Sequence, residues 1–132
     1  MENFRDFSLG PDPFGRTWHV QLKYLQTAIS IRHSDSVDVC FILESTGGDQ
    51  GAEKLIRTIV IPHADIRAWS QKTGGKISDP WCSRIAYSKL KDSVITGEDI
   101  DKEYLVVTPK EIDEYADAVK KWEAEWLKSH AA

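Results

Sequence analysis

Cys82 comes closest to a nucleophile in type and position. It lies about three residues into a helix that Asp79 and Pro80 are expected to open, and the positive end of a helix dipole stabilises a thiolate. Asp79 opposes that shift, and Cys82 borders an apolar stripe that contains Trp81 and Ile85, where cysteine packs as a small hydrophobic residue. We retain Cys82 as a candidate catalytic residue, with a buried, inert thiol as the alternative.

His63 and Asp65 form the second candidate for catalysis. They follow Pro62, where the apolar segment 55–61 ends and a helix is expected to begin. A histidine and a carboxylate at such a junction could act as a general base or as ligands. The alternative is that Asp65 caps the helix start while His63 lies at the surface.

The other short motifs do not have the spacing of a known site. HExxH, a His/Cys cluster and GxSxG do not occur, so neither a zinc site nor a serine hydrolase is indicated. The Gly74-Gly75-Lys76 segment does not match a phosphate-binding loop, and the acidic segment 98–103 does not match a calcium-binding EF-hand. We expect no metal and no cofactor.

The tryptophans are the stronger signal, because five occur in 132 residues. Trp69, Trp81 and Trp122 lie on expected helices, where burial in the core explains them. Trp126 and Leu127 lie near the chain end and are expected to overhang the domain and contact another subunit or a partner. Trp122 lies one helical turn before Trp126 and completes the set of interface candidates.

Length and composition indicate one soluble domain over residues 1–132. Hydrophobic residues make up 41% and charged residues 29%, which are ordinary globular values. No stretch reaches the roughly 18 apolar residues of a membrane span, and the start MENFRDFSLG lacks the pattern of a signal peptide. We expect a cytoplasmic protein without a membrane association, and its two cysteines are expected to be reduced thiols.

The charge is distributed unevenly along the chain. The net charge is -4, and residues 98–132 hold 10 of the 21 acidic residues but 5 of the 17 basic ones. Nucleic-acid binding depends on clustered lysine and arginine, and the chain contains no such cluster. We therefore expect a protein partner or a homo-oligomer and no nucleic acid.

The first half of the chain has strand patterning. Residues 17–27 alternate as in a half-buried strand, although Trp18, Leu22 and Leu25 also recur at helical spacing, so a helix remains an alternative. A polar turn at 34–36 predicts a hairpin. Segment 55–61 is apolar on both faces apart from Arg57 and Thr58, as in a strand inside a sheet. Residues 1–16 are expected to form an irregular strap.

Prolines punctuate the second half at the starts of three expected helices, about 63–72, 80–96 and 109–128. Gly74-Gly75 and Gly97 suit the ends of the first two. Asp79 is expected to cap the second helix, and Thr108 with Glu111 forms a capping box for the third. Residues 104–107 are short enough to add a strand to the sheet.

These elements predict an α+β fold, with an antiparallel sheet of three to five strands, mostly within residues 17–61, and three C-terminal helices packed mainly on one face. The other face is expected to be polar and to present the side chains of His19, Gln21, Lys23, Asp38 and Cys40.

Two functions are consistent with this fold. The first is a small non-enzymatic interaction or regulatory module, which the acidic, tryptophan-bearing C-terminal helix favours. The alternative is a small enzyme or ligand-binding domain that uses the polar sheet face and the strand-to-helix junction at His63 and Asp65.

Overall fold

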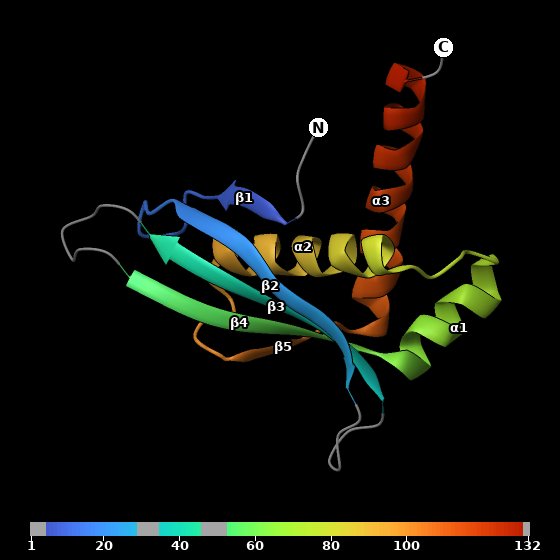
Figure 1. Cartoon of the computed structure of the whole chain (residues 1–132), viewed down its shortest axis with the longest axis horizontal. Helices are drawn as coiled ribbons and strands as arrows, with labels where there is room; N and C mark the ends of the chain where they lie inside the picture. The colour runs from blue at the N-terminus through green and yellow to red at the C-terminus, as the bar shows by residue number, and fades with distance from the viewer. Residues whose placement is uncertain (1–4, 29–34, 46–52, 131–132) are drawn as a thin grey trace.

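A five-stranded sheet and three helices form the fold (Figure 1). The computed structural model describes residues 5–28, 35–45 and 53–130. The elements in chain order are β1 (Asp6–Leu9), β2 (Trp18–Ala28), β3 (Ser36–Ser45), β4 (Glu53–Pro62), α1 (His63–Thr73), α2 (Asp79–Thr96), β5 (Tyr104–Val106) and α3 (Pro109–His130). The predicted α+β class is confirmed.

The strands lie in the sheet in chain order, β1-β2-β3-β4-β5. The pairs from β1 to β4 are antiparallel and β5 joins β4 in parallel, because the chain crosses over through α1 and α2 before it returns. The strand interpretation of residues 17–27 is confirmed and the helix alternative is wrong. The β2–β3 pairing confirms the hairpin, and the predicted turn lies partly outside the described residues.

The core lies between one face of the sheet and the helices. α2 lies against the sheet, while α3 packs on α1 and α2 and rises away from it (Figure 1). The largest fully buried side chains come from strands and helices alike: Phe41, Leu43, Ile59, Ile61, Ile85, Leu90, Leu105 and Ile112. None of the helices in the described ranges has the length and apolar content needed to cross a membrane.

The face of the sheet opposite the helices, called the outer face below, is less polar than expected. By register, His19, Gln21 and Asp38 lie on this face as expected. A bulge at Lys23 shifts the β2 register by one residue and places Tyr24 on the same face. One outer row is now Tyr24, Cys40, Thr58 and Tyr104. Cys40 is only 1% exposed, so the prediction that it belongs to an open polar face is wrong.

The N-terminal strap is not irregular throughout, because residues 6–9 form β1 at the sheet edge. The turn after β1 is organised by the Asp12 carboxylate, which accepts hydrogen bonds from Phe14 N at 2.9 Å, Arg16 N at 2.8 Å and Trp18 Nε1 at 3.1 Å. Burial opposes ionisation of Asp12, but these donors outweigh it and lower its pKa. Asp12 thereby ties the turn to the buried Trp18.

The helix ends follow local chemistry. Gly74 and Gly97 end α1 and α2 in the left-handed conformation, as predicted, and Thr108 with Glu111 forms the predicted capping box. The α2 cap is different from the prediction: Ser78 Oγ accepts a hydrogen bond from Trp81 N at 3.2 Å. Asp79 is the first helical residue and not the cap, because the serine before it already occupies the extended cap position.

Candidate functional site

Cys82 lies in the core of the fold. Its side chain is buried beside the α2 stripe that faces the sheet. Burial, followed by the negative charge of Asp79, raises the pKa of the Cys82 thiol to about 11. The thiol is therefore protonated at neutral pH, and these properties argue against a role as a nucleophile.

His63 and Asp65 lie in the first turn of α1, directly after β4. Their side chains are half-buried. The backbone N–H of His63 donates to the Asp35 carbonyl at 2.8 Å, and Pro62 occupies the cap position without a side-chain hydrogen bond. Within the part of the chain that the structure describes, the two side chains form no hydrogen bond or ion pair with each other.

Metal ligation has little support from the geometry. Among residues 5–28, 35–45 and 53–130, no three His, Cys, Asp or Glu side chains are grouped closely enough to hold a metal ion. His19 does lie at 2.5 Å from Asp6, Nε2 to Oδ1, but this pair joins two neighbouring strands at the surface. We treat it as a cross-strand contact of the sheet edge.

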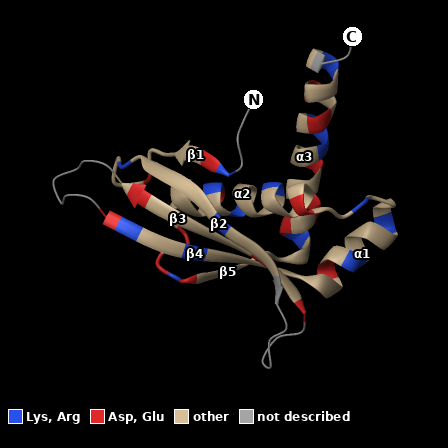
Figure 2. Ribbon diagram, in the orientation of Figure 1, with Lys and Arg blue, Asp and Glu red and all other residues tan. Residues whose placement is uncertain are grey.

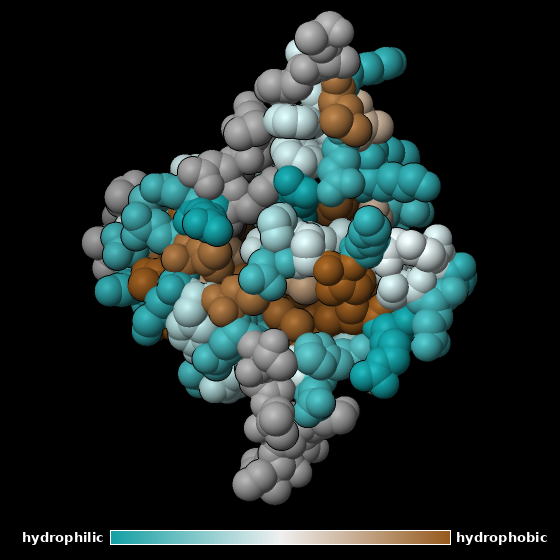
Figure 3. Space-filling view, turned by 45° about the vertical axis from the view of Figure 1, so that its right-hand side comes forward, coloured by the Kyte–Doolittle hydropathy of each residue, from teal (hydrophilic) through white to brown (hydrophobic). Residues whose placement is uncertain are grey.

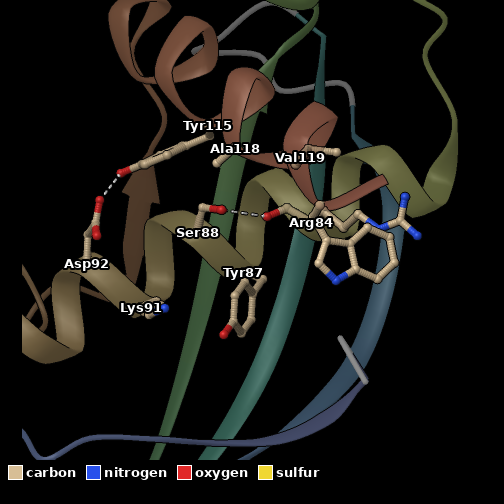
Figure 4. A pocket seen from close by; sticks show the side chains of 9 residues that line it. Arg84, Tyr87, Ser88, Lys91, Asp92, Tyr115, Ala118 and Val119 are labelled. Carbon is tan, nitrogen blue, oxygen red and sulfur yellow. Dashed lines mark hydrogen bonds between the residues drawn. The ribbon is translucent and has the colours of Figure 1, made fainter. Parts of the chain in front are cut away.

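A groove of about 300 Å³ lies between α2 and α3 (Figure 4). This volume is at the lower end of the range for small-molecule pockets. The lining from α2 recurs at one-turn spacing. The lining residues are Arg84, Tyr87, Ser88, Lys91 and Asp92 from α2, and Tyr115, Ala118, Val119 and Trp122 from α3.

Cations and aromatic rings form one side of the groove. The Arg84 guanidinium lies 4.1 Å from the centre of the Trp122 ring, within cation–π range, and donates to Glu123 at 2.8 Å. Lys91 Nζ lies 5.9 Å from the centre of the Tyr87 ring. These contacts hold Trp122 against α2, so the indole is half-buried before α3 leaves the body of the protein.

A polar network closes the other end of the groove. The Tyr115 hydroxyl lies 2.8 Å from an Asp92 oxygen and 3.0 Å from a Glu111 oxygen, and Lys89 donates to Glu111 at 2.8 Å. Burial and the neighbouring carboxylates raise the pKa of Tyr115 well above its ordinary value. Burial opposes ionisation of Glu111, but the hydrogen bonds from Lys89 and Thr108 lower its pKa. This end is therefore a fixed anionic cluster with a tyrosine donor.

The last turns of α3 project from the body of the protein (Figure 1). Val119 is the last buried residue among those described, and about three helical turns follow it. Trp126 is 37% exposed and Leu127 is 61% exposed, and Figure 3 shows hydrophobic surface on this end. Charges of both signs surround them along α3 (Figure 2). The structure thus places all three interface candidates, Trp122 included, on one stretch of helix.

The α2 side of the groove was not predicted from the sequence. Arg84, Tyr87 and Lys91 recur at spacings of three and four residues, which puts them on one helix face. This pattern can be found in the sequence. The crossing of α2 and α3 that brings Trp122 to Arg84 cannot. Comparison with protein-family models, with curated proteins and with solved structures gave no match.

Proposed function

We propose that this chain is a non-enzymatic interaction module that binds a protein partner through the projecting end of α3. A single observation carries the proposal: a helical segment that adds little to the core still bears Trp126 and Leu127, both exposed. Helix–helix recognition commonly inserts such an amphipathic segment into an apolar groove of the partner. A homo-oligomer through the same residues is the other outcome of the test.

The composition of the projecting segment supports an interface. A helical extension needed only for solubility would carry charged and small residues, because large exposed apolar side chains gain nothing in water. Trp122 and Trp126 are one turn apart and lie on the same side of α3. Tryptophan is the residue type most enriched among residues that dominate binding energy.

A cytoplasmic location belongs to the same proposal. Cys40 and Cys82 are both buried, free thiols, and cysteines remain reduced in the cytosol. A regulatory or adaptor role in that compartment requires no cofactor.

The alternative is a small enzyme or ligand-binding domain. The polar sheet face is weaker support for it, since Cys40 is buried. The junction is also weaker support, since among the described residues His63 and Asp65 form no hydrogen bond or ion pair with each other. The groove between α2 and α3 is the better place for a small ligand, because aromatic and charged groups converge there. A thermal-shift screen with metals, nucleotides and metabolites tests this alternative, since a specific ligand raises the unfolding temperature.

The experiment for the interaction proposal is affinity capture followed by a direct binding measurement. The bait is the wild-type chain, the Trp126→Ala/Leu127→Ala variant, or the control Ile95→Ala, which removes an exposed hydrophobic residue from α2. Proteins retained by wild type and control but lost with the double variant are then purified and titrated by calorimetry.

We expect the double variant to weaken binding by at least about 2 kcal/mol, or about 30-fold in Kd, and the control to change it by less than about 0.5 kcal/mol. Equal binding by all three baits contradicts the proposal. Light scattering of the same variants reports whether the partner is a second copy of the chain.

A further inference from the structure

The outer face of the sheet is largely apolar over three consecutive cross-strand rows. Ile42 pairs with Ile56 in the first row, Tyr24 and Tyr104 flank the second, and Val60 with Val106 lies in the third. The polar members of these rows are Gln21 in the first, Thr58 in the second, and Gln26 and Asp38 in the third. Four of the nine large hydrophobic residues that are exposed within the described ranges belong to these rows: Tyr24, Ile56, Tyr104 and Val106. An apolar concentration of this kind on a sheet face marks an interaction surface.

The charges on this face are few and lie toward its ends. Asp38 is held by a hydrogen bond from the Ser36 hydroxyl at 2.9 Å. At the opposite end, Glu44 of β3 pairs in register with Lys54 of β4, and in Figure 2 acidic and basic residues lie side by side where β3 ends and β4 begins. The face therefore combines an apolar centre with Asp38 toward one end and, at the other end, the adjacent pair of Glu44 and Lys54.

We propose that two copies of this chain dimerise by stacking their outer sheet faces. The twofold axis runs parallel to the strands, between β3 and β4, so that β3 of one copy covers β4 of the other. Stacked sheets lie about 10 Å apart with their strands within about 30° of each other, which leaves the side chains of these rows to fill the space between them.

Charge complementarity indicates that a second copy of the chain covers the outer face. This axis places Glu44 over Lys54 of the second copy and, by symmetry, Lys54 over Glu44 of the second copy. The same operation places Ile42 over Ile56 of the second copy and Tyr24 over Tyr104 of the second copy. The rows that contain Glu44 and Ile42 thus meet rows that match them in charge and polarity, which an unrelated surface has no reason to provide.

The dimer face is separate from the surface assigned to the protein partner. The outer face lies on the opposite side of the sheet from α2, against which α3 packs. The dimer therefore does not depend on the proposed function, and it leaves both copies of α3 projecting. A dimer of this geometry is a bivalent module.

The first test compares matched substitutions by sedimentation equilibrium over about a hundredfold range of concentration. Ile56 is 40% exposed on the outer face and Ile95 is 44% exposed on α2. We expect wild type and Ile95→Lys to show the same monomer–dimer equilibrium and Ile56→Lys to weaken it about 30-fold or more. A wild type that stays monomeric throughout overturns the proposal, as does equal dimerisation by Ile56→Lys and Ile95→Lys.

The second test isolates contacts between copies from contacts within one copy. Lys54→Glu puts two acidic residues on the end row and Glu44→Lys puts two basic residues there, so each variant alone places like charges opposite each other in the dimer. When the two variants are mixed, every facing pair becomes opposite in charge.

We expect each variant alone to dimerise at least about tenfold more weakly than wild type and the mixture to form a heterodimer. Mixing leaves the pair within each copy unchanged, so any association that is recovered arises from contacts between the copies. A mixture that associates no better than its components overturns the proposed geometry, and circular dichroism confirms that each variant is folded.

Discussion

Replacing Tyr115 with phenylalanine tests the network at the end of the groove. The ring stays buried in the core, while the hydroxyl that lies 2.8 Å from Asp92 and 3.0 Å from Glu111 is removed. A hydrogen bond to a charged acceptor contributes about 1.5–3 kcal/mol. Asp92 is exposed and the Glu111 side chain is 22% exposed, so water replaces part of the loss. We expect Tyr115→Phe to lower the free energy of unfolding by about 1–2 kcal/mol.

The assay is urea unfolding followed by circular dichroism, with Ile95→Val as the control because the Ile95 side chain is exposed on α2. The control is expected to change the free energy of unfolding by less than about 0.5 kcal/mol. In thermal unfolding the expected loss for Tyr115→Phe corresponds to a fall in Tm of about 3–7 °C for a chain of this size.

A second readout distinguishes the hydrogen bond from general packing. The Tyr115 hydroxyl is one of the donors that lower the pKa of Glu111, so the pKa of Glu111 should rise in Tyr115→Phe when followed by NMR. An unfolding free energy equal to that of the control, together with an unchanged Glu111 pKa, would refute the reasoning. Removing only the hydroxyl leaves Lys89 and Thr108 bound to Glu111.

Three further predictions follow from the buried and capping groups. Folding lowers the pKa of Asp12 and Glu111 from their ordinary 3.8 and 4.5. The stability that these carboxylates contribute is therefore present above those values and is lost as pH falls through the folded pKa values. Urea unfolding should show that the free energy of unfolding declines between neutral and acid pH, and that this decline is smaller in the Asp12→Asn variant. Cys82, whose pKa is raised to about 11, should resist alkylation at neutral pH until the protein is denatured, and rapid modification of the folded protein would contradict this. Ser78→Ala should lower the free energy of unfolding by about 1 kcal/mol in the same assay, because the α2 cap is lost. An unchanged free energy of unfolding would show that Ser78 does not cap α2.

The helices were the most predictable part of the fold, because their signals are local. The apolar spacing of Ile112, Tyr115 and Val119 predicts the packed face of α3, and all three residues are buried. The cap of α2 failed by one residue, since Ser78 and Asp79 are both good cap residues and only the backbone geometry decides between them.

The sheet was less predictable than the helices, because the side chains that share a face depend on the register between strands. β1 was missed because a four-residue strand among prolines and glycines carries too little alternation. The outer face was predicted in part. By register it contains the expected His19, Gln21, Asp38 and Cys40, but the bulge at Lys23 also places Tyr24 on it. Cys40 is buried on that face within a row flanked by Tyr24 and Tyr104, and such cross-strand cover depends on register that the sequence does not state.

The candidate site was predictable only in part. Trp126 and Leu127 were identified from their position near the chain end and are exposed. Trp122 was identified from its one-turn spacing to Trp126. The contact between Arg84 and Trp122 depends on the angle at which α2 and α3 cross, which is a tertiary property that neither helix encodes alone.

Amide hydrogen exchange of the chain with and without its captured partner tests the central claim most directly. The projecting turns of α3 after Val119 bury little surface, so their amides should exchange fast in the free protein. We predict that the partner slows amide exchange in residues 120–130 and leaves exchange in the turn around His63 and Asp65 unchanged. Slowed exchange at that turn, with no change in residues 120–130, would contradict it.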